Sequence, residues 1–295
     1  MKPAAFRYEV PESIPAALEL KARFGDDASF LAGGQSLVPA MNFRLARPAV
    51  LIDLNTLADL AYVRPAPDGL RIGALTRTRA VERDQLVADH QPLLHEAVPH
   101  VAHPQIRNRS TIGGNLAHAD PASEMPAVVL ALGGRLKAVS SRGERWIAAG
   151  DFFTGPLTTA LAVDEMLTEI ALPALPDNAG TCFLEVARRQ GDYAMMGVAA
   201  VVALDEAGIC RHAQLAYCNA AGTPVLAVEA GRCLLGRPPG ETLLRTAAAH
   251  ATGEVDPPGN VQASAAYQRH LAGALTVRAL RTAFARAGAP VGVAA

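Results

Sequence analysis

Two glycine-containing stretches dominate this sequence: LAGGQSL at residues 31–37 and TIGGNL at residues 111–116. Each sets a glycine pair beside hydroxyl or amide side chains, and the first begins in an apolar run typical of a buried strand. Because glycine lets a ligand approach the main chain closely, consecutive N–H groups in such turns can converge on phosphate oxygens. Together the two turns predict a grip on a diphosphate, to which Ser36, Thr111 and Asn115 would add side-chain hydrogen bonds.

Neither stretch matches the common nucleotide-binding motifs. The sequence around them has no G-x-G-x-x-G opening a helix and no glycine-rich loop ending in lysine and serine or threonine. A Rossmann or P-loop site is therefore disfavoured. Taken singly, each glycine pair is more often a simple tight turn, and the residues alone leave that alternative open.

The sequence on either side of the first stretch predicts one small α/β unit over residues 1–57. Alternating apolar residues at 6–10 indicate a strand, and Ser13 stands where it would cap a helix over residues 14–24. Two further short buried strands are predicted at residues 29–32 and 49–54.

A second unit is predicted over residues 58–176. Turn sequences at residues 67–69 and 140–143 lie between strand-like runs, which indicates two hairpins. Helical patterns occupy residues 78–88, 92–102 and 124–132.

The Pro-rich segment LPALPDNAG at residues 172–180 is the best domain boundary in the chain, because proline removes strand donors and glycine loosens the backbone. A third domain over residues 177–295 follows. Its strand-like runs come first and its helical runs later, an order typical of an α+β fold. The predicted strands are residues 181–187, 197–204 and 209–218, and the predicted helices are residues 224–235, 240–252 and 261–287.

Composition excludes several classes of protein. The 295 residues include 27 Lys+Arg and 28 Asp+Glu, for a formal net charge of −1, so no general electrostatic case exists for a nucleic-acid partner. The longest apolar run, residues 194–204, is far shorter than a membrane-spanning helix requires. The first residues show no signal-peptide core, and a cytoplasmic location is expected.

Four cysteines occur, at positions 182, 210, 218 and 233, without any C-x-x-C pair. Their neighbours are apolar, which favours reduced thiols that pack as small hydrophobic side chains. An iron–sulfur cluster or structural zinc site in this chain is therefore not expected.

Beyond these patterns, residues 31–54 and IRNRSTIGGNLAHADP at residues 106–121 closely resemble the FAD-binding medium subunit of molybdenum hydroxylases, the relatives of carbon monoxide dehydrogenase and xanthine dehydrogenase. FLEVARRQGDYA at residues 183–194 looks like the start of that family's C-terminal domain. The resemblance implies an FAD fold of the vanillyl-alcohol oxidase type, built from the first two units, followed by a C-terminal α+β domain with an antiparallel sheet and helices.

The resemblance also implies a set of cofactor-binding residues. The two glycine stretches would hold the FAD diphosphate, His118, Ser123 and Glu124 would approach the ribityl and adenosine parts, and Tyr193 would lie beside the isoalloxazine. Relatives often have aspartate at the position of Glu124. The predicted residues are Ala32, Gly33, Gly34, Gln35, Ser36, Thr111, Gly113, Gly114, Asn115, His118, Ser123, Glu124 and Tyr193.

Some nearby residues are left out of this set. Arg107 and Arg109 are interpreted as surface ion-pair partners. Glu185 stands where some relatives have lysine near the flavin, so no electrostatic role is assigned to it. His103 invites comparison with the covalent flavin histidines of other oxidases, but the medium subunits bind FAD non-covalently, and the same is expected here.

The implied function is that of a flavoprotein subunit in a molybdenum hydroxylase complex. It would take electrons from the [2Fe–2S] clusters of a small partner subunit and pass them through FAD to an external acceptor, while a large partner subunit carries molybdopterin. The expected assembly is a dimer of heterotrimers. Two alternatives are a stand-alone flavin-dependent oxidoreductase of the same fold and a non-enzymatic assembly module whose glycine turns are only structural.

Overall fold

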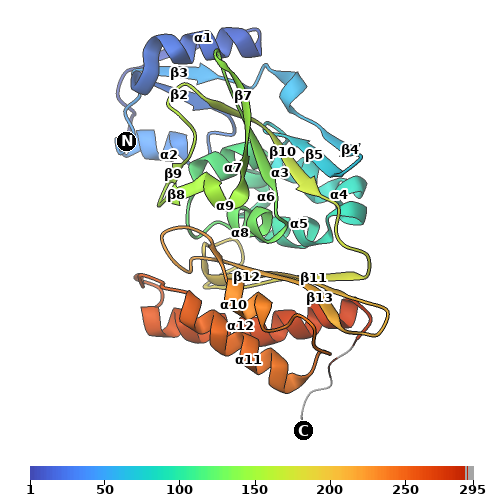
Figure 1. Ribbon diagram of the computed structural model, residues 1–295. Coiled ribbons are helices and arrows are strands. Elements are labelled where there is room, and N and C mark those ends of the chain that lie inside the picture. The colour runs from blue at the N-terminus through green and yellow to red at the C-terminus, as the bar shows by residue number, and fades with distance from the viewer. Residues whose placement is uncertain (290, 292–295) are drawn as a thin grey trace.

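The computed structural model describes residues 1–289 and 291, so the last residues of the predicted third domain lie outside the described part. Figure 1 shows three sheets in succession along the molecule, with the N-terminal sheet at one end and the C-terminal helices at the other. The mixed helix-and-sheet class predicted from the sequence is confirmed. The divisions at residues 57 and 176 remain predictions.

The N-terminal sheet is parallel and has three strands in the order β1-β3-β2. Parallel strands need crossover connections, and here α1 lies on the connection from β1 to β2 and α2 on the connection from β2 to β3. Ser13 caps this helix as predicted, its hydroxyl oxygen accepting the Ala16 N–H at 3.3 Å. The elements are β1 (Arg7–Glu9), α1 (Ile14–Phe24), η1 (Gly25–Asp27), β2 (Ala28–Leu31), α2 (Leu37–Asn42), β3 (Val50–Asp53) and η2 (Ala58–Leu60).

The second sheet has five strands in the order β4-β5-β10-β6-β7, and every neighbouring pair is antiparallel. Both predicted hairpins are confirmed as β4–β5 and β6–β7. Figure 1 shows helices gathered on one side of this sheet. The strands are β4 (Val63–Ala66), β5 (Gly69–Gly73), β6 (Arg135–Ser140), β7 (Gly143–Ala148) and β10 (Met166–Pro173), with a small pair β8 (Phe153–Gly155) and β9 (Thr158–Thr159).

The helices of this unit are shorter than the sequence pattern suggested. The helix predicted at 78–88 is interrupted at Asp84, which starts a new helix by accepting the N–H groups of Leu86 and Val87. The helix predicted at 92–102 begins at Pro92 as expected but ends at Ala97, because Pro99 in the following 3-10 helix has no N–H to donate. The helix at 124–132 is confirmed. The observed elements are α3 (Thr78–Arg83), α4 (Gln85–His90), α5 (Pro92–Ala97), η3 (Val98–His100), α6 (Pro104–Arg107), α7 (Ile112–His118), α8 (Glu124–Ala131) and α9 (Ala149–Phe152).

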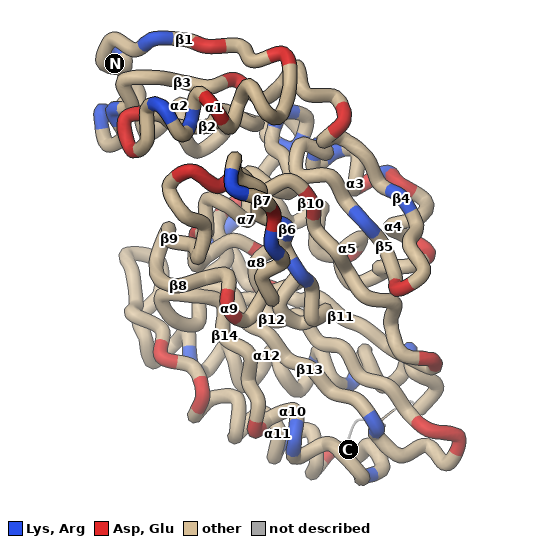
Figure 2. The backbone as a smooth tube through the Cα atoms, turned by 45° about the horizontal axis from the view of Figure 1, so that its top comes forward, with Lys and Arg blue, Asp and Glu red and all other residues tan. Residues whose placement is uncertain are grey.

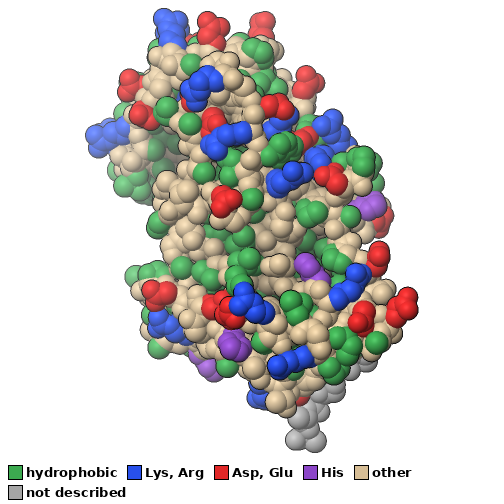
Figure 3. All heavy atoms as spheres, in the orientation of Figure 1, with side chains coloured by type: hydrophobic (Ala, Val, Ile, Leu, Met, Phe, Trp, Pro, Cys, Tyr) green, Lys and Arg blue, Asp and Glu red, His purple; other side chains and the backbone are tan. Residues whose placement is uncertain are grey.

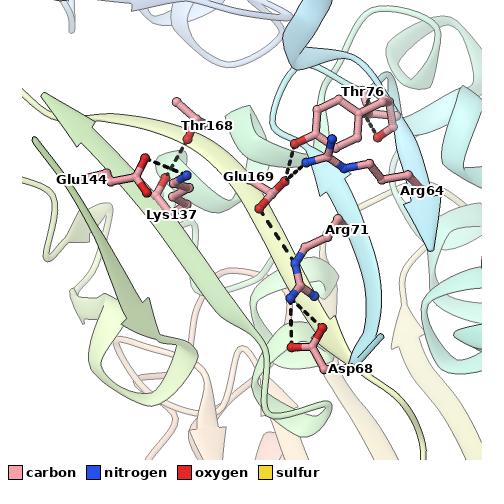
Figure 4. Close-up of polar contacts among 9 residues, drawn as sticks. Arg64, Asp68, Arg71, Thr76, Lys137, Glu144, Thr168 and Glu169 are labelled. Atoms are coloured by element: carbon pink, nitrogen blue, oxygen red, sulfur yellow. Dashed lines mark hydrogen bonds and ion pairs between the residues drawn. The ribbon is translucent and has the colours of Figure 1, made fainter. Parts of the chain in front are cut away.

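Ion pairs run across one face of the five-stranded sheet, as Figure 4 shows. On β5, Leu70 and Ile72 enter the core, so Arg71 between them faces the other way. Glu169 of β10 lies between Arg71 and Arg64 of β4, and its carboxylate accepts an N–H of Arg64 at 2.8 Å. This face of the sheet is therefore polar while the opposite face packs against the helices.

The third sheet is antiparallel in the order β11-β12-β13-β14. Alternate residues of β11 enter different cores: Phe183 packs toward the second unit, and Cys182 packs toward the C-terminal helices. The predicted helix at 224–235 is wrong at its start, where β14 pairs with β13 before the helix begins. The elements are β11 (Ala179–Ala187), β12 (Ala194–Leu204), β13 (Cys210–Cys218), β14 (Val225–Leu226), α10 (Val228–Arg232), α11 (Glu241–Glu254) and α12 (Ala265–Arg286).

All four cysteines are free, and Cys182, Cys210 and Cys218 are buried, as predicted. Charged side chains of both signs are interspersed along the backbone and over the face seen in Figure 3, in keeping with the near-zero net charge. Figure 2 shows the same mixture on the five-stranded sheet. Within the described residues, no helix is both long enough and apolar enough to cross a bilayer.

Gly180 lets helix α12 pack directly on β11. A Cβ at this position would lie 1.9 Å from the Ala283 carbonyl oxygen and 2.6 Å from the Ala287 nitrogen. Because these are backbone atoms, Gly180→Ala is expected to lower the free energy of unfolding by about 3 kcal/mol, measured by urea denaturation. Gly253→Ala is the matched control: its methyl group meets open space on a helix and should stabilise by about 0.5–1 kcal/mol. Equal effects of the two substitutions would contradict this explanation.

Candidate cofactor site

A cavity of about 590 Å³ runs from the N-terminal sheet past α7 and α8 to the loop before β12. Every cofactor residue predicted from the sequence lines it. The first glycine stretch comes from the loop between β2 and α2, and the second from the start of α7. Residues more than 150 positions apart in the chain, such as Ala32 and Tyr193, thus share one cavity. Their roles toward a cofactor remain predictions at this point.

The first glycine stretch presents unpaired backbone donors. Within the described part of the chain, the N–H groups of residues 33–36 donate to no protein acceptor. Within this loop, the Gln35 side-chain amide donates to the Gly33 carbonyl at 3.0 Å. Gly34 has a φ of 72°, which glycine adopts without strain. A run of free N–H groups in a loop is the geometry that binds an anion such as a diphosphate.

The second glycine stretch differs from the prediction. It is the first turn of helix α7, and the N–H groups of its glycines are used by the protein. The Gly113 N–H donates to the Ala74 carbonyl at 2.9 Å, and the Gly114 N–H donates to the Thr111 hydroxyl at 3.0 Å. The prediction of a second turn with free N–H groups is therefore wrong, because Thr111 acts as a helix N-cap.

The glycines of both stretches are needed for close packing. A Cβ on Gly33 would lie 2.5 Å from the Arg109 carbonyl oxygen and 2.6 Å from the Ser110 Cα. A Cβ on Gly113 would lie 2.4 Å from that of Ala74. The first stretch thus sits directly on the backbone that leads into the second, which is why the two line one cavity.

Side chains beyond the glycines are fixed by one another. The Ser123 hydroxyl donates to the Asn115 side-chain oxygen at 2.9 Å, and this bond joins α7 to the start of α8. His118, at the end of α7, also lines the cavity. Tyr193 lies on the loop between β11 and β12 and is 56% exposed, so it is a loop residue at the cavity rim rather than part of a strand.

Glu124, the first residue of α8, is buried although it lines the cavity. Burial in the interior and the negative charge of nearby Glu185 raise the pKa of Glu124 to about 7. Glu185 lies on β11 and forms an ion pair with His100 of η3, with 3.2 Å between Oε1 and Nδ1. The other oxygen of Glu185, Oε2, is buried and has no partner among the described residues.

Lys21 is a cavity residue that the sequence analysis missed. Its Nζ donates to the carbonyls of Gly25 at 2.7 Å and Ala28 at 2.6 Å, and burial lowers its pKa. A signal was present in the sequence, because Lys21 lies three residues after Leu18 and seven after Ile14 on the apolar face of α1. A lysine on an apolar face is either paired or functional.

Arg107 is buried, so its interpretation as a surface residue is wrong. Its guanidinium donates to Glu82 at 2.8 Å and also to the carbonyls of Val101 and Ala102, at 3.0 and 2.8 Å. The last two residues line the cavity. Arg109 does not line it, although its carbonyl packs against Gly33. His103 packs beneath Gly191 and is not in the cavity lining either.

Arg107→Met is expected to lower the free energy of unfolding by about 3 kcal/mol, because it leaves Glu82 and several carbonyls without their shared donor. Thermal or urea denaturation measures the loss. Arg79→Met removes the other cation that pairs with Glu82, at a half-exposed position, and should cost less than about 1 kcal/mol. A cost for Arg107→Met as small as for Arg79→Met would contradict the buried role.

Comparisons with known proteins place this fold in the class of flavoproteins. Residues 4–175 match the family described as "FAD binding domain in molybdopterin dehydrogenase", and residues 181–283 match "CO dehydrogenase flavoprotein C-terminal domain". The chain belongs to the family of FAD-binding medium subunits of molybdenum hydroxylases, as the resemblance indicated, and it is an oxidoreductase subunit.

Individual relatives match over nearly the whole chain. The 6-hydroxypseudooxynicotine dehydrogenase complex subunit alpha of Paenarthrobacter nicotinovorans is 40% identical over 287 residues, 97% of each chain. The caffeine dehydrogenase subunit beta of a Pseudomonas species is 41% identical, over 96% of each chain. A solved carbon monoxide dehydrogenase chain from Hydrogenophaga pseudoflava superposes with a TM-score of 0.95 at 35% identity, over 97% of this chain and 99% of that one.

The cavity fits FAD on its own structural features. The unpaired N–H groups of residues 33–36 match a diphosphate, and the polar side chains of Asn115, Ser123 and Glu124 match ribityl and ribose hydroxyls. The glycines keep this part of the lining free of side chains.

Proposed function

We propose that this chain is the electron outlet of a molybdenum hydroxylase complex, in which its FAD takes electrons from the [2Fe–2S] clusters of a small partner subunit and delivers them to an external acceptor. The observation that carries the proposal is the run of unpaired N–H groups at residues 33–36, in a cavity lined by every predicted cofactor residue. Relatives named as subunits of dehydrogenase complexes support it.

The residues of this chain bind and orient the cofactor. The N–H groups of residues 33–36 would hold the diphosphate oxygens, and the hydrogen-bonded pair Asn115 and Ser123 would offer polar groups to the ribityl chain. Glu124 would hold a sugar hydroxyl, and Tyr193 at the exposed rim would hold the flavin. When bound non-covalently, FAD supplies the electron transfer, while the protein supplies position and solvent control.

The partners follow from the same proposal. The cysteines Cys182, Cys210 and Cys218 of this chain are buried in its core. We assign the [2Fe–2S] clusters to the small subunit and molybdopterin to a large one, as the family resemblance implies. The assembly is a dimer of heterotrimers. Reduced, buried cysteines also favour the cytoplasm as its location.

The test uses the whole complex, purified with its partner subunits, in two forms: wild type and Gly33→Ala. In the wild type, substrate should reduce clusters and flavin, and an external acceptor should then reoxidise both. In a variant complex that has lost FAD but kept iron and molybdenum, substrate should still reduce the clusters, and acceptor reduction should stop. Undiminished acceptor reduction without FAD would overturn the proposed role.

A further inference from the structure

Three titratable groups lie between the surface and the cofactor cavity: His100, Glu185 and Glu124. His100 is partly exposed, with a side chain 34% accessible, and its Nδ1 lies 3.2 Å from Glu185 Oε1. The Glu185 side chain is only 5% accessible, and its second oxygen, Oε2, has no partner among the described residues. On the cavity side, Glu124 is 4% exposed.

The packing of two units brings these groups together. Glu185 lies two residues after Phe183 on β11 and so shares the face of the C-terminal sheet that packs toward the second unit. Helix α8, which begins at Glu124, packs against β12 and β13 of the same sheet. Because α8 also packs against η3, which carries His100, the two buried carboxyl groups and the imidazole lie in one region between the two units. The single positive charge of His100 can neutralise only one carboxylate.

The charge of the cavity favours a neutral Glu124 when an anion is bound. Of the lysines and arginines in the described residues, Lys21 alone lines the cavity, whereas its acidic lining residues are Asp120, Glu124, Glu165 and Asp192. A diphosphate brings further negative charge. Each ionised carboxylate that remains beside it in a poorly solvated cavity weakens binding.

We infer that Glu124 holds FAD in its protonated, hydrogen-bond-donating form, and that the buried carboxylate of Glu185 is a positioning group that keeps this proton on Glu124, an effect that the cation of His100 limits. The inference rests on the proposed function, since it takes FAD as the ligand. Binding of FAD above neutral pH then takes up a proton, and a higher pH weakens binding.

Other groups near Glu124 must be considered in the test. The titratable groups that interact with it through charge are Asp120, Glu185, His100, Tyr193 and Cys218. His118 lines the same cavity, so its substitution serves as a control. Oxidised FAD itself has no group that titrates near neutral pH.

The experiment measures the dissociation constant of FAD for the full-length apoprotein between about pH 6 and 9 by flavin fluorescence. For the wild type, each pH unit above the transition should weaken binding about tenfold. Glu124→Gln, which cannot lose a proton, should keep tight binding and remove the transition. Calorimetry in buffers of different ionisation enthalpy should show uptake of close to one proton at the alkaline end for the wild type, and none from this site in Glu124→Gln.

The positioning role is tested by two substitutions with opposite effects. Glu185→Gln removes the repelling carboxylate and should move the transition to lower pH, whereas His100→Gln removes the cation and should move it to higher pH. A merely structural role would change affinity without moving the transition. His118→Gln serves as the control that leaves the transition in place, and thermal unfolding verifies that each variant is folded.

The outcomes separate the two proposals. If the wild type binds no FAD at any pH, the proposed function fails. If it binds FAD with an affinity that does not vary with pH and without proton uptake, the proposed function stands and the proton-linked role of Glu124 is overturned. A pH dependence that disappears in His118→Gln and persists in Glu124→Gln would overturn it as well.

Discussion

Replacing Gly33 by alanine is expected to empty the protein of FAD. The new methyl group would lie 2.5 Å from the Arg109 carbonyl oxygen and 2.6 Å from the Ser110 Cα, and neither backbone atom can rotate away. The loop must therefore shift, and the N–H groups of residues 33–36 shift with it. Because binding depends on several donors that converge on one anion, we expect FAD content to fall from about one per chain to below a tenth.

The measurement is an absorption spectrum of the purified protein, followed by acid release and quantification of the flavin. Gly240→Ala is the matched control, because a Cβ at that position meets nothing within 4 Å. Gly114→Val is a second test in the other stretch, where a Cβ would meet the Thr111 hydroxyl at 2.7 Å and Ala32 at 3.5 Å. Full FAD content in Gly33→Ala would show that these amides do not hold the cofactor.

Glu124→Gln is expected to make the FAD-free protein more stable at pH 8 by about 3 kcal/mol. Burial and the charge of Glu185 raise the pKa of Glu124 from 4.5 in the unfolded chain to about 7 in the fold. Between these values the folded protein keeps a proton that the unfolded chain has released, so the free energy of unfolding falls as the pH rises through this window. Glutamine has no such proton to lose, so the substitution removes this loss of stability at high pH.

Urea denaturation without added FAD, at about pH 5 and pH 8, measures this effect. The increase in the free energy of unfolding caused by Glu124→Gln should be small at pH 5 and near its full value at pH 8. Glu206→Gln, at an exposed position, should change neither value by more than about 0.5 kcal/mol. A gain that is equal at both values of pH would mean that burial does not shift the ionisation of Glu124.

The sequence predicted helices and strands well wherever the hydrophobic pattern and the turn residues indicated the same boundaries. The hairpin at residues 136–148 and the long strands of the third sheet were recovered because β6 alternates, β12 is a continuous apolar run, and glycine-containing turns bound both. The break at Asp84 was missed because the apolar positions continue in helical register across it, while its side chain caps a new helix. The end of the next helix at Ala97 was missed because apolar residues continue through Val98 and Val101.

The sequence motifs predicted which residues line the cavity. They did not predict the buried ion pairs around it, which involve Arg107, Glu185 and His100. Local pattern could not show that Arg107 is buried, because its partners, Glu82 and the carbonyls of residues 99–102, meet it only in the folded chain. For the same reason no local pattern indicated the ion pair of Glu185 with His100: the two stand 85 residues apart, on β11 and η3, and meet only in the folded chain. Long-range ion pairs of this kind have no local sequence period.

The backbone N–H groups of the two glycine stretches differ in whether the protein already supplies their acceptors, and this difference sets the order in which the binding site forms. At residues 113–115 the backbone donors are already satisfied by the protein, so this half is rigid before any ligand arrives. At residues 33–36 the donors have no acceptor among the described residues and are free to bind an anion. Amide hydrogen exchange at residues 113–115 should therefore be slow with and without FAD, whereas exchange at residues 33–36 should become slow only when FAD is bound. In the apoprotein, one side of the cavity is thus already ordered, and the other becomes ordered when the cofactor binds.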